Sequence, residues 1–167
     1  EGYPIGFQKE DAALATRLRE IARNPIPQHR VCIPDVFSGI SSYNKESRKF
    51  WKDFLFRGNG LTLFNKYFQS GPYLNTQISR FYEHLKDKTE TPQYISLWRQ
   101  IFHNRHLILV EGTGSKLGFH NDLFEGAASI RRIVCPAENA FNYYHAILET
   151  TLDKAKGMDL LVLIALG

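Results

Sequence analysis

The sequence predicts an α/β fold of the Rossmann-like type, in which helices cover a mostly parallel sheet. Three apolar runs lack the polar alternation of a half-exposed strand, which is typical of strands buried on both faces: His106–Val110, Ile130–Cys135 and Leu160–Leu166. Segments with helical spacing alternate with them along the chain, as in doubly wound sheets. Because 167 residues with 43% hydrophobic and 23% charged side chains suit one globular unit, we expect a single domain over residues 1–167.

The N-terminal part of the chain begins with a predicted helix and a short strand. Leu14, Leu18 and Ile21 recur at helical spacing, so Lys9–Arg23 is predicted as an amphipathic helix that ends before Asn24-Pro25. Arg30–Phe37 is predicted as a short apolar strand. Its Pro34 lacks a backbone N–H, which places a turn at the end of that strand.

Residues 50–86 contain two further predicted helices. The apolar side chains of Phe50, Trp51 and Phe54 indicate a helix stopped by Gly58-Asn59-Gly60. Leu61–Phe68 is compatible with a strand. Gly71-Pro72 marks a break, followed by a helix to about Lys86.

Two more helices flank the apolar runs in the C-terminal half. Pro92 suits the first turn of a helix with an apolar stripe that includes Trp98, and Pro136–Asn139 leads into a predicted helix Ala140–Lys154. The chain starts without Met and stops at Gly167, at the end of a predicted strand, so we expect it to be part of a longer polypeptide.

Charge and cysteine content narrow the class of protein. The formal net charge of +4 is spread along the chain without a basic block, which argues against a nucleic-acid partner and allows a mild preference for phosphorylated ligands. Cys32 and Cys135 lie in apolar runs and are predicted to be buried free thiols. No signal peptide or transmembrane run is visible, so a cytoplasmic location is expected.

The loop after the first apolar run has the residues of an anion site. Ligands of parallel sheets bind beyond the carboxyl ends of the strands, and Gly112, Gly114 and Gly118 allow backbone N–H groups to approach a phosphate closely. Lys116 adds a positive charge. The glycine spacing matches neither a Walker A loop nor a dinucleotide fingerprint, so phosphate binding and a plain tight turn both fit.

Polar residues near this loop have a functional and a structural interpretation. Glu111 leaves a buried strand, where a carboxylate is costly unless it has a partner or a ligand. Asn121 and Asp122 stand at the start of a predicted helix. A helix N-terminus favours a bound anion, so these residues either belong to an anion site or simply cap the helix. Glu138 and Asn139 suit a nucleotide contact or a helix start.

Two residues outside these loops have similar alternatives. Arg80 can reach a phosphate or form a surface ion pair with Glu83, and Asp35 can contact a metal, act as a base or belong to a Pro-Asp turn. None of the six histidines forms a pair with metal-ligand spacing.

Taken in order, six segments of the chain resemble the GT-D fold glycosyltransferases, a bacterial family long described only as a domain of unknown function. They are GYPIGFQ, IPDVF, SRFY, HLILVEGTGSKLGFHNDLF, IRRIVCPAENAF and LLVLIALG. The resemblance implies transfer of a hexose, typically glucose from UDP-glucose, to a glycan on a serine-rich surface adhesin or a polysaccharide. The implied site residues are Glu111, Asn121, Asp122, Glu138 and Asn139, with Arg80 as a weaker match.

The chain also departs from the family pattern. The Asp-x-Glu motif, which the family uses with a divalent cation (Mn²⁺ or Mg²⁺) and the nucleotide, is expected upstream of GYPIGFQ, and a helix is expected after LLVLIALG; neither is in this chain. Lys116 stands where the family pattern suggests Arg, so the bidentate fork of a guanidinium is lost. Phe119-His120 replaces a smaller pair and narrows the expected pocket.

These residues suggest a mechanism with open alternatives. Loss of a diphosphate needs charge stabilisation, which we assign to Lys116 and the Gly112–Gly118 backbone, and an inverting transfer needs a carboxylate base, for which Asp122 and Glu111 are candidates. A non-catalytic nucleotide-binding module is the main alternative, and a phosphatase with Asp35 as nucleophile is a second. A homo-oligomer is compatible with the sequence.

Overall fold

The computed structural model describes residues 6–23, 28–68 and 73–166. Its internal contacts divide the chain into two compact units, and each is described here by itself. The first unit contains the described residues between 10 and 91, and the second contains residues 6–9 together with 92–166. The single domain expected over residues 1–167 therefore stays a prediction.

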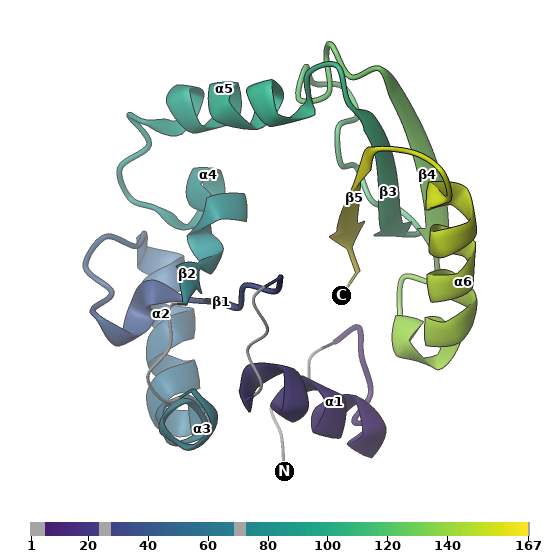
Figure 1. Ribbon diagram of the computed structural model, residues 1–167. Helices are drawn as coiled ribbons and strands as arrows, with labels where there is room; N and C mark the ends of the chain where they lie inside the picture. The colour runs from purple at the N-terminus through teal and green to yellow at the C-terminus, as the bar shows by residue number, and fades with distance from the viewer. Residues whose placement is uncertain (1–5, 24–27, 69–72, 167) are drawn as a thin grey trace. The chain divides into compact units, whose positions relative to one another are not determined.

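The second unit is built on a three-stranded parallel sheet (Figure 1). Its strands are β3 (His106–Gly112), β4 (Ser129–Cys135) and β5 (Leu160–Ala165), in the order β4-β3-β5. The central strand pairs with both neighbours, and Leu107 is in register with Ile130 on one side and Leu161 on the other. Leu107 to Val110 are at most 1% exposed. This confirms the predicted parallel sheet and, for β3, the predicted burial on both faces. The two outer strands are less buried: Val134 of β4 is 66% exposed and Ile164 of β5 is 70% exposed.

The two faces of this sheet have separate apolar cores. On one face, Leu107 and Leu109 pack with Phe102, from helix α5 (Thr91–Phe102), and with Phe124. On the other face, Ile108 and Val110 pack with Ile133 and Cys135, and helix α6 (Tyr144–Ala155) covers them, as Figure 1 shows beside β4. Since side chains alternate between faces along a strand, a central strand covered by helices must be apolar at every position.

The predicted helices of this unit are confirmed with small shifts. Pro92 lies in the first turn of α5, where its missing N–H has no intrahelical partner to lose. The helix predicted over Ala140–Lys154 starts as a 3-10 turn, Ala140–Tyr143, and becomes α-helical at Tyr144.

The first unit is mainly helical, with one very short parallel pair of strands. Its elements are α1 (Ala12–Arg23), β1 (Cys32–Ile33), a 3-10 turn (Asp35–Phe37), α2 (Lys45–Lys52), a π-helical turn (Asp53–Arg57), α3 (Gly60–Tyr67), β2 (Leu74–Asn75), a 3-10 turn (Thr76–Ser79) and α4 (Phe81–His84). The strands β1 and β2 pair in parallel through Cys32 and Leu74. The amphipathic helix predicted near the N-terminus is thus confirmed; Asn24-Pro25 and Gly71-Pro72 lie outside the described residues.

Three predictions for this unit are wrong. Residues 61–67, predicted with Phe68 as a strand, belong to helix α3, in which Phe64 stacks on Phe37 at 3.7 Å and on Phe68, just after the helix, at 5.9 Å. Short apolar runs fit helix and strand equally well, and here tertiary packing decides. The strand predicted over Arg30–Phe37 is two residues long, since the chain turns into a 3-10 helix after Pro34. The helix predicted up to Lys86 breaks into short turns on either side of Arg80.

The prediction for the cysteines is half right. Cys135 is buried in the sheet, whereas Cys32, in the two-residue strand β1, is exposed. Within the described residues, no helix is long and apolar enough to cross a membrane.

Candidate functional site

The loop that follows β3 folds on itself through its own amides. The N–H and Oγ1 of Thr113 both donate to the Cys135 carbonyl, at 2.8 and 2.9 Å. The N–H groups of Ser115, Leu117 and Phe119 donate to acceptors within the same loop, at 3.0, 3.3 and 3.0 Å. These four N–H groups therefore cannot also bind a phosphate in this conformation. The predicted phosphate contacts of the loop backbone are thus limited to its remaining N–H groups.

The loop glycines differ in why glycine is present. Gly114 has a φ of +87°, and a Cβ there would meet nothing within 4 Å. Gly118 has a φ of +72°, and a Cβ there would overlap the ring of Phe124. Gly112 has no left-handed φ, and a Cβ there would lie 3.4 Å from the Ala137 Cα, an ordinary van der Waals contact, so neither space nor backbone requires glycine at this position. Open space at Gly114 makes it the point where a ligand can approach the backbone most closely.

Glu111 is buried and ion-paired with Arg132. Its side chain is 4% exposed, and one carboxylate oxygen accepts a hydrogen bond from Arg132 Nη1. Because Leu109 is in register with Arg132 and side chains two positions apart share a face, Glu111 and Arg132 point to the same side of the sheet. The partner that a buried carboxylate requires is thus supplied by the protein itself.

Asn121 and Asp122 do not start a helix, so the predicted helix cap is wrong. The segment makes turns, in which Asn121 Nδ2 donates to the Phe119 carbonyl and Asn121 Oδ1 accepts from Leu123 N–H, both at 3.1 Å. Local side-chain hydrogen bonds of this type compete with helix formation. The Asp122 carboxylate is 61% exposed and pairs with Arg99 Nη1 at 2.8 Å.

Arg99 joins two carboxylates of this segment. Its Nη2 also donates to Glu125 at 2.7 Å, so one guanidinium on α5 holds both Asp122 and Glu125. Lys116 is exposed, and no carboxylate of the described residues pairs with it. Its charge therefore remains available to an anion.

Glu138 and Asn139 lie in the loop after β4, the neighbouring strand. Asn139 adopts a left-handed φ of +54°, its N–H donates to the Phe7 carbonyl at 2.8 Å, and its Oδ1 accepts from Lys9 N–H at 2.9 Å. Asn139 thus fastens residues 7–9 to the second unit and leaves only its side-chain amide group for a ligand. Glu138 is exposed beside it.

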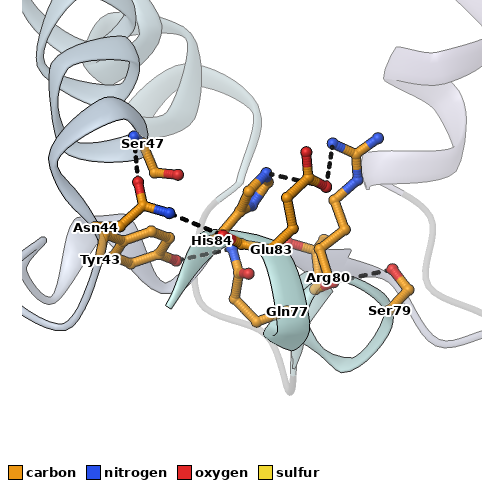
Figure 2. Close-up of polar contacts among 9 residues, drawn as sticks. Tyr43, Asn44, Ser47, Gln77, Ser79, Arg80, Glu83 and His84 are labelled. Carbon is orange, nitrogen blue, oxygen red and sulfur yellow. Dashed lines mark hydrogen bonds and ion pairs between the residues drawn. The ribbon is translucent and has the colours of Figure 1, made fainter. Parts of the chain in front are cut away.

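Arg80, the weakest predicted site residue, belongs to the first unit (Figure 2). Its guanidinium lies 3.7 Å from the Glu83 carboxylate, and both side chains are more than half exposed. This is the surface ion pair that the sequence offered as the alternative to a phosphate contact, and such pairs contribute little to stability.

Asp35 takes part in a buried hydrogen-bond network of the first unit. The hydroxyl of fully buried Tyr43 donates to the Asp35 carboxylate and accepts from Gln77 Nε2 at 3.0 Å. Burial, and then the hydrogen bond to Asp35, raise the pKa of Tyr43 far above its ordinary value. Asp35 begins the 3-10 turn after Pro34, which agrees with the Pro-Asp turn among the predicted alternatives, and its carboxylate is occupied by the Tyr43 hydroxyl.

The polar residues beside this network connect two helices, as Figure 2 shows. Asn44 caps α2 by accepting from Ser47 N–H at 2.9 Å, and its Nδ2 donates to the Glu83 carbonyl at 2.8 Å. Burial lowers the pKa of His84, and its Nδ1 has no hydrogen-bond partner. The network stabilises the first unit.

Comparison with known proteins identifies the family. The sequence model of the protein family described as the glycosyltransferase GT-D fold matches residues 1–167. The chain belongs to this family. The GT-D resemblance, predicted from the sequence motifs, is thereby confirmed, and the α/β architecture is that of the GT-D fold.

Two curated streptococcal relatives match nearly the whole chain. The probable glycosyl transferase Gly of Streptococcus gordonii is 35% identical over 164 residues, covering 98% of this chain and 24% of the relative. Glycosyltransferase GlyD of Streptococcus pneumoniae serotype 4 is 32% identical over 167 residues, covering 99% of this chain and 20% of the relative. The chain thus spans about a quarter of the length of these relatives or less.

Solved structures of the GT-D family match with the same fold. A new glycosyltransferase from Streptococcus sanguinis has a TM-score of 0.85 and 34% identity, over 96% of this chain and 60% of that one. A domain of unknown function 1792, described as a distinct glycosyltransferase fold, has a TM-score of 0.84 and 37% identity, over 98% of this chain and 58% of that one.

The GT-D residues of this chain do not fit a metal site by themselves. Among the described residues, no three His, Cys, Asp or Glu side chains lie close enough to hold a metal ion. Glu111 and Asp122, the carboxylates at the two ends of the loop, are each paired with an arginine. No step of a mechanism is therefore assigned to a metal held by these residues.

Two arginines of this GT-D site were not predicted from the sequence. Arg132 stands in the apolar run IRRIVC, where a charged residue on a buried face needs an acidic partner, and that was a readable signal. Arg99 lies on α5, 23 residues before Asp122, and nothing in the sequence spacing indicated their pairing.

Proposed function

We propose that the protein is a hexosyltransferase that moves a sugar, typically glucose, from a UDP-sugar to a glycan acceptor on a bacterial surface glycoprotein or polysaccharide. The observation that carries this proposal is the family match over the whole chain, combined with the loop Glu111–Asp122 at the carboxyl edge of the parallel sheet. That edge is where ligands of open parallel sheets bind.

Donor binding is supported by charge and access at this loop. Lys116 is an exposed cation without a carboxylate partner among the described residues, and Gly114 leaves open space beside the backbone. A diphosphate that contacts both would have its departing charge offset as the bond to the sugar breaks. Glu138 and the side-chain amide of Asn139, on the adjacent loop, are proposed to contact the rest of the nucleotide. Arg80 stays a weaker prediction.

Asp122 suits the role of base better than Glu111 does. In an inverting transfer the acceptor hydroxyl attacks the anomeric carbon, the bond to the diphosphate breaks, and a carboxylate takes the hydroxyl proton. Asp122 is 61% exposed and can meet an acceptor, whereas Glu111 is 4% exposed and held by Arg132. We therefore assign the proton transfer to Asp122. Glu111 becomes a supporting residue.

The test is transfer by the intact protein. UDP release is measured with a panel of UDP-sugars, with and without Mn²⁺ or Mg²⁺ and a glycan acceptor. Asp122→Asn should lower the rate by about 10²- to 10⁴-fold, the usual contribution of a positioned base, and Asp153→Asn on α6 is the matched control. Tight UDP binding without turnover of any sugar would replace the proposal by a non-catalytic nucleotide-binding module. An unchanged rate in the Asp122 variant would leave that residue only its ion pair with Arg99.

The same assay addresses the remaining expectations. A dependence on Mn²⁺ or Mg²⁺ would support the divalent cation that the family implies. The cytoplasmic location and a homo-oligomer stay predictions.

A further inference from the structure

Arg132 contacts three parts of the second unit at once. Its Nη1 donates to buried Glu111, its Nη2 donates to the Leu117 carbonyl at 2.9 Å, and its guanidinium carbon lies 4.3 Å above the centroid of the Phe119 ring. Leu117 and Phe119 belong to the loop that follows β3, whereas Arg132 lies in the middle of β4. One side chain therefore connects the sheet to the loop at two points.

The three contacts need the shape of a guanidinium. A planar fork can donate in two directions along its edges while its face stacks on an aromatic ring. A lysine ammonium has no plane and cannot make the stacking contact together with both bonds. Arg132 is 25% exposed, so its charge is partly withdrawn from water and requires the Glu111 carboxylate.

Glu111 serves mainly to hold this arginine. Its second oxygen, Oε2, is buried and has no hydrogen-bond partner, so Arg132 is the only residue that compensates its charge in the described part of the chain. A buried pair of this kind fixes geometry more than it adds stability. The direction of Arg132 is thus determined by a carboxylate in the central strand.

We infer that Arg132 is a positioning residue for the donor loop: braced by Glu111, it fixes Leu117 and Phe119 and thereby the conformation in which Lys116 is presented. This inference rests on the proposed function only in taking the loop to be the one that binds the donor. The positioning itself concerns the loop and can be measured without any transfer reaction. Lys116 directly precedes Leu117, and its carbonyl accepts a hydrogen bond from Phe119 N–H at 3.0 Å, so its backbone is tied to both fixed residues.

The experiment compares two neighbouring arginines in the intact protein. Arg132→Lys keeps the charge and removes the fork, and Arg131→Lys is the matched control, since Arg131 is exposed on the other face of the same strand. Hydrogen exchange of peptides over residues 112–124 should become about tenfold faster in the first variant, the factor expected when a hydrogen bond from a charged donor is lost. The control should match the wild type.

Donor kinetics give a second readout that a purely stabilising arginine would not change. For Arg132→Lys we expect a rise in the donor KM and a loss of about 10- to 100-fold in kcat/KM, because misplacement by about 1 Å costs that much. The double variant Glu111→Gln/Arg132→Met removes both charges of the pair, so that no unpaired buried charge remains to prevent folding. Its loop should also exchange faster, since the Leu117 carbonyl has lost its donor.

Two results would overturn the inference. In the first, the hydrogen-exchange rate of the loop and the donor KM are the same in Arg132→Lys as in Arg131→Lys. The other is a lower melting temperature with faster exchange in β3 and β4 but not in the loop, which would make Arg132 a general stabiliser. If the wild type transfers no sugar, the proposed function fails, while loop exchange still decides the role of Arg132.

Discussion

Replacing Gly118 by Ala should destabilise the second unit through two separate effects. The φ of +72° is costly for a residue with a Cβ, by about 1 to 2 kcal/mol. The new Cβ would also overlap the ring of Phe124, a core residue 7% exposed that packs on Phe102 with ring centroids 5.1 Å apart. Overpacking of a core typically costs a further 1 to 3 kcal/mol or so. We therefore expect a total loss of about 2 to 5 kcal/mol.

Gly114→Ala is the matched control for this prediction. Its φ of +87° carries the same backbone cost, but a Cβ there meets nothing within 4 Å. The difference between the two variants isolates the clash with Phe124 and should be about 1 to 3 kcal/mol. At about 2 to 4 °C per kcal/mol, the melting temperature of Gly118→Ala should lie some 2 to 12 °C below that of Gly114→Ala.

Thermal unfolding followed by circular dichroism measures both melting temperatures. A second variant, Gly118→Ala with Phe124→Leu, gives the new methyl group room and should recover part of the difference. Equal melting temperatures for the two alanine variants would refute the reasoning, because the Phe124 ring would then not limit the space at Gly118.

Three further predictions concern titratable groups. Burial and the Asp35 hydrogen bond raise the pKa of Tyr43, so one of the eight tyrosines should not ionise in a spectrophotometric titration until the protein unfolds. Because the pKa in the folded state exceeds that in the unfolded state, the stability due to Tyr43 is present below about pH 10 and falls above it. The variant Tyr43→Phe should lack this loss of stability at high pH. Burial lowers the pKa of His84, so the stability of the wild type should fall as the pH drops below about 6.5. Melting temperatures between pH 5 and 7.5 should show a steeper fall on acidification for the wild type than for His84→Gln. A thiol reagent should modify exposed Cys32 quickly in the native protein and buried Cys135, whose pKa burial raises, only on unfolding; equal rates for both would contradict the burial of Cys135.

The sheet was predictable because its information is local. Every position of β3 from Leu107 to Val110 is apolar, and such a run is typical of a strand covered on both faces. The run that became β5 is also apolar throughout, whereas the run that became β4 includes Arg131 and Arg132, and both strands are less buried than β3. The wrong prediction at Leu61–Phe68 arose where the pattern was short, and contact with Phe37, distant in sequence, favoured the helix.

For the candidate site, the sequence indicated a position but not the contacts that its residues make. The sequence indicated that chemistry lies after β3, because glycines and a lysine follow a buried strand there, and that Glu111 needs a partner. It did not reveal that Arg132 is this partner, since the pairing depends on the register between β3 and β4. It also misassigned Asn121 and Asp122 to a helix start, because an Asn that caps a helix and an Asn that closes a turn look the same in sequence.

The sequence alone therefore determined the parallel sheet and the family, and it indicated the loop after β3 as the candidate site. Each of these depends on residue types at short spacing along one strand or loop. Only the tertiary structure decided which carboxylate is buried and which is accessible: Glu111 is held by Arg132, while Asp122 is exposed beside Arg99. The reason is physical. The environment of a charged side chain is set by neighbours on other strands and helices, and their distance in space is not written in their separation along the chain.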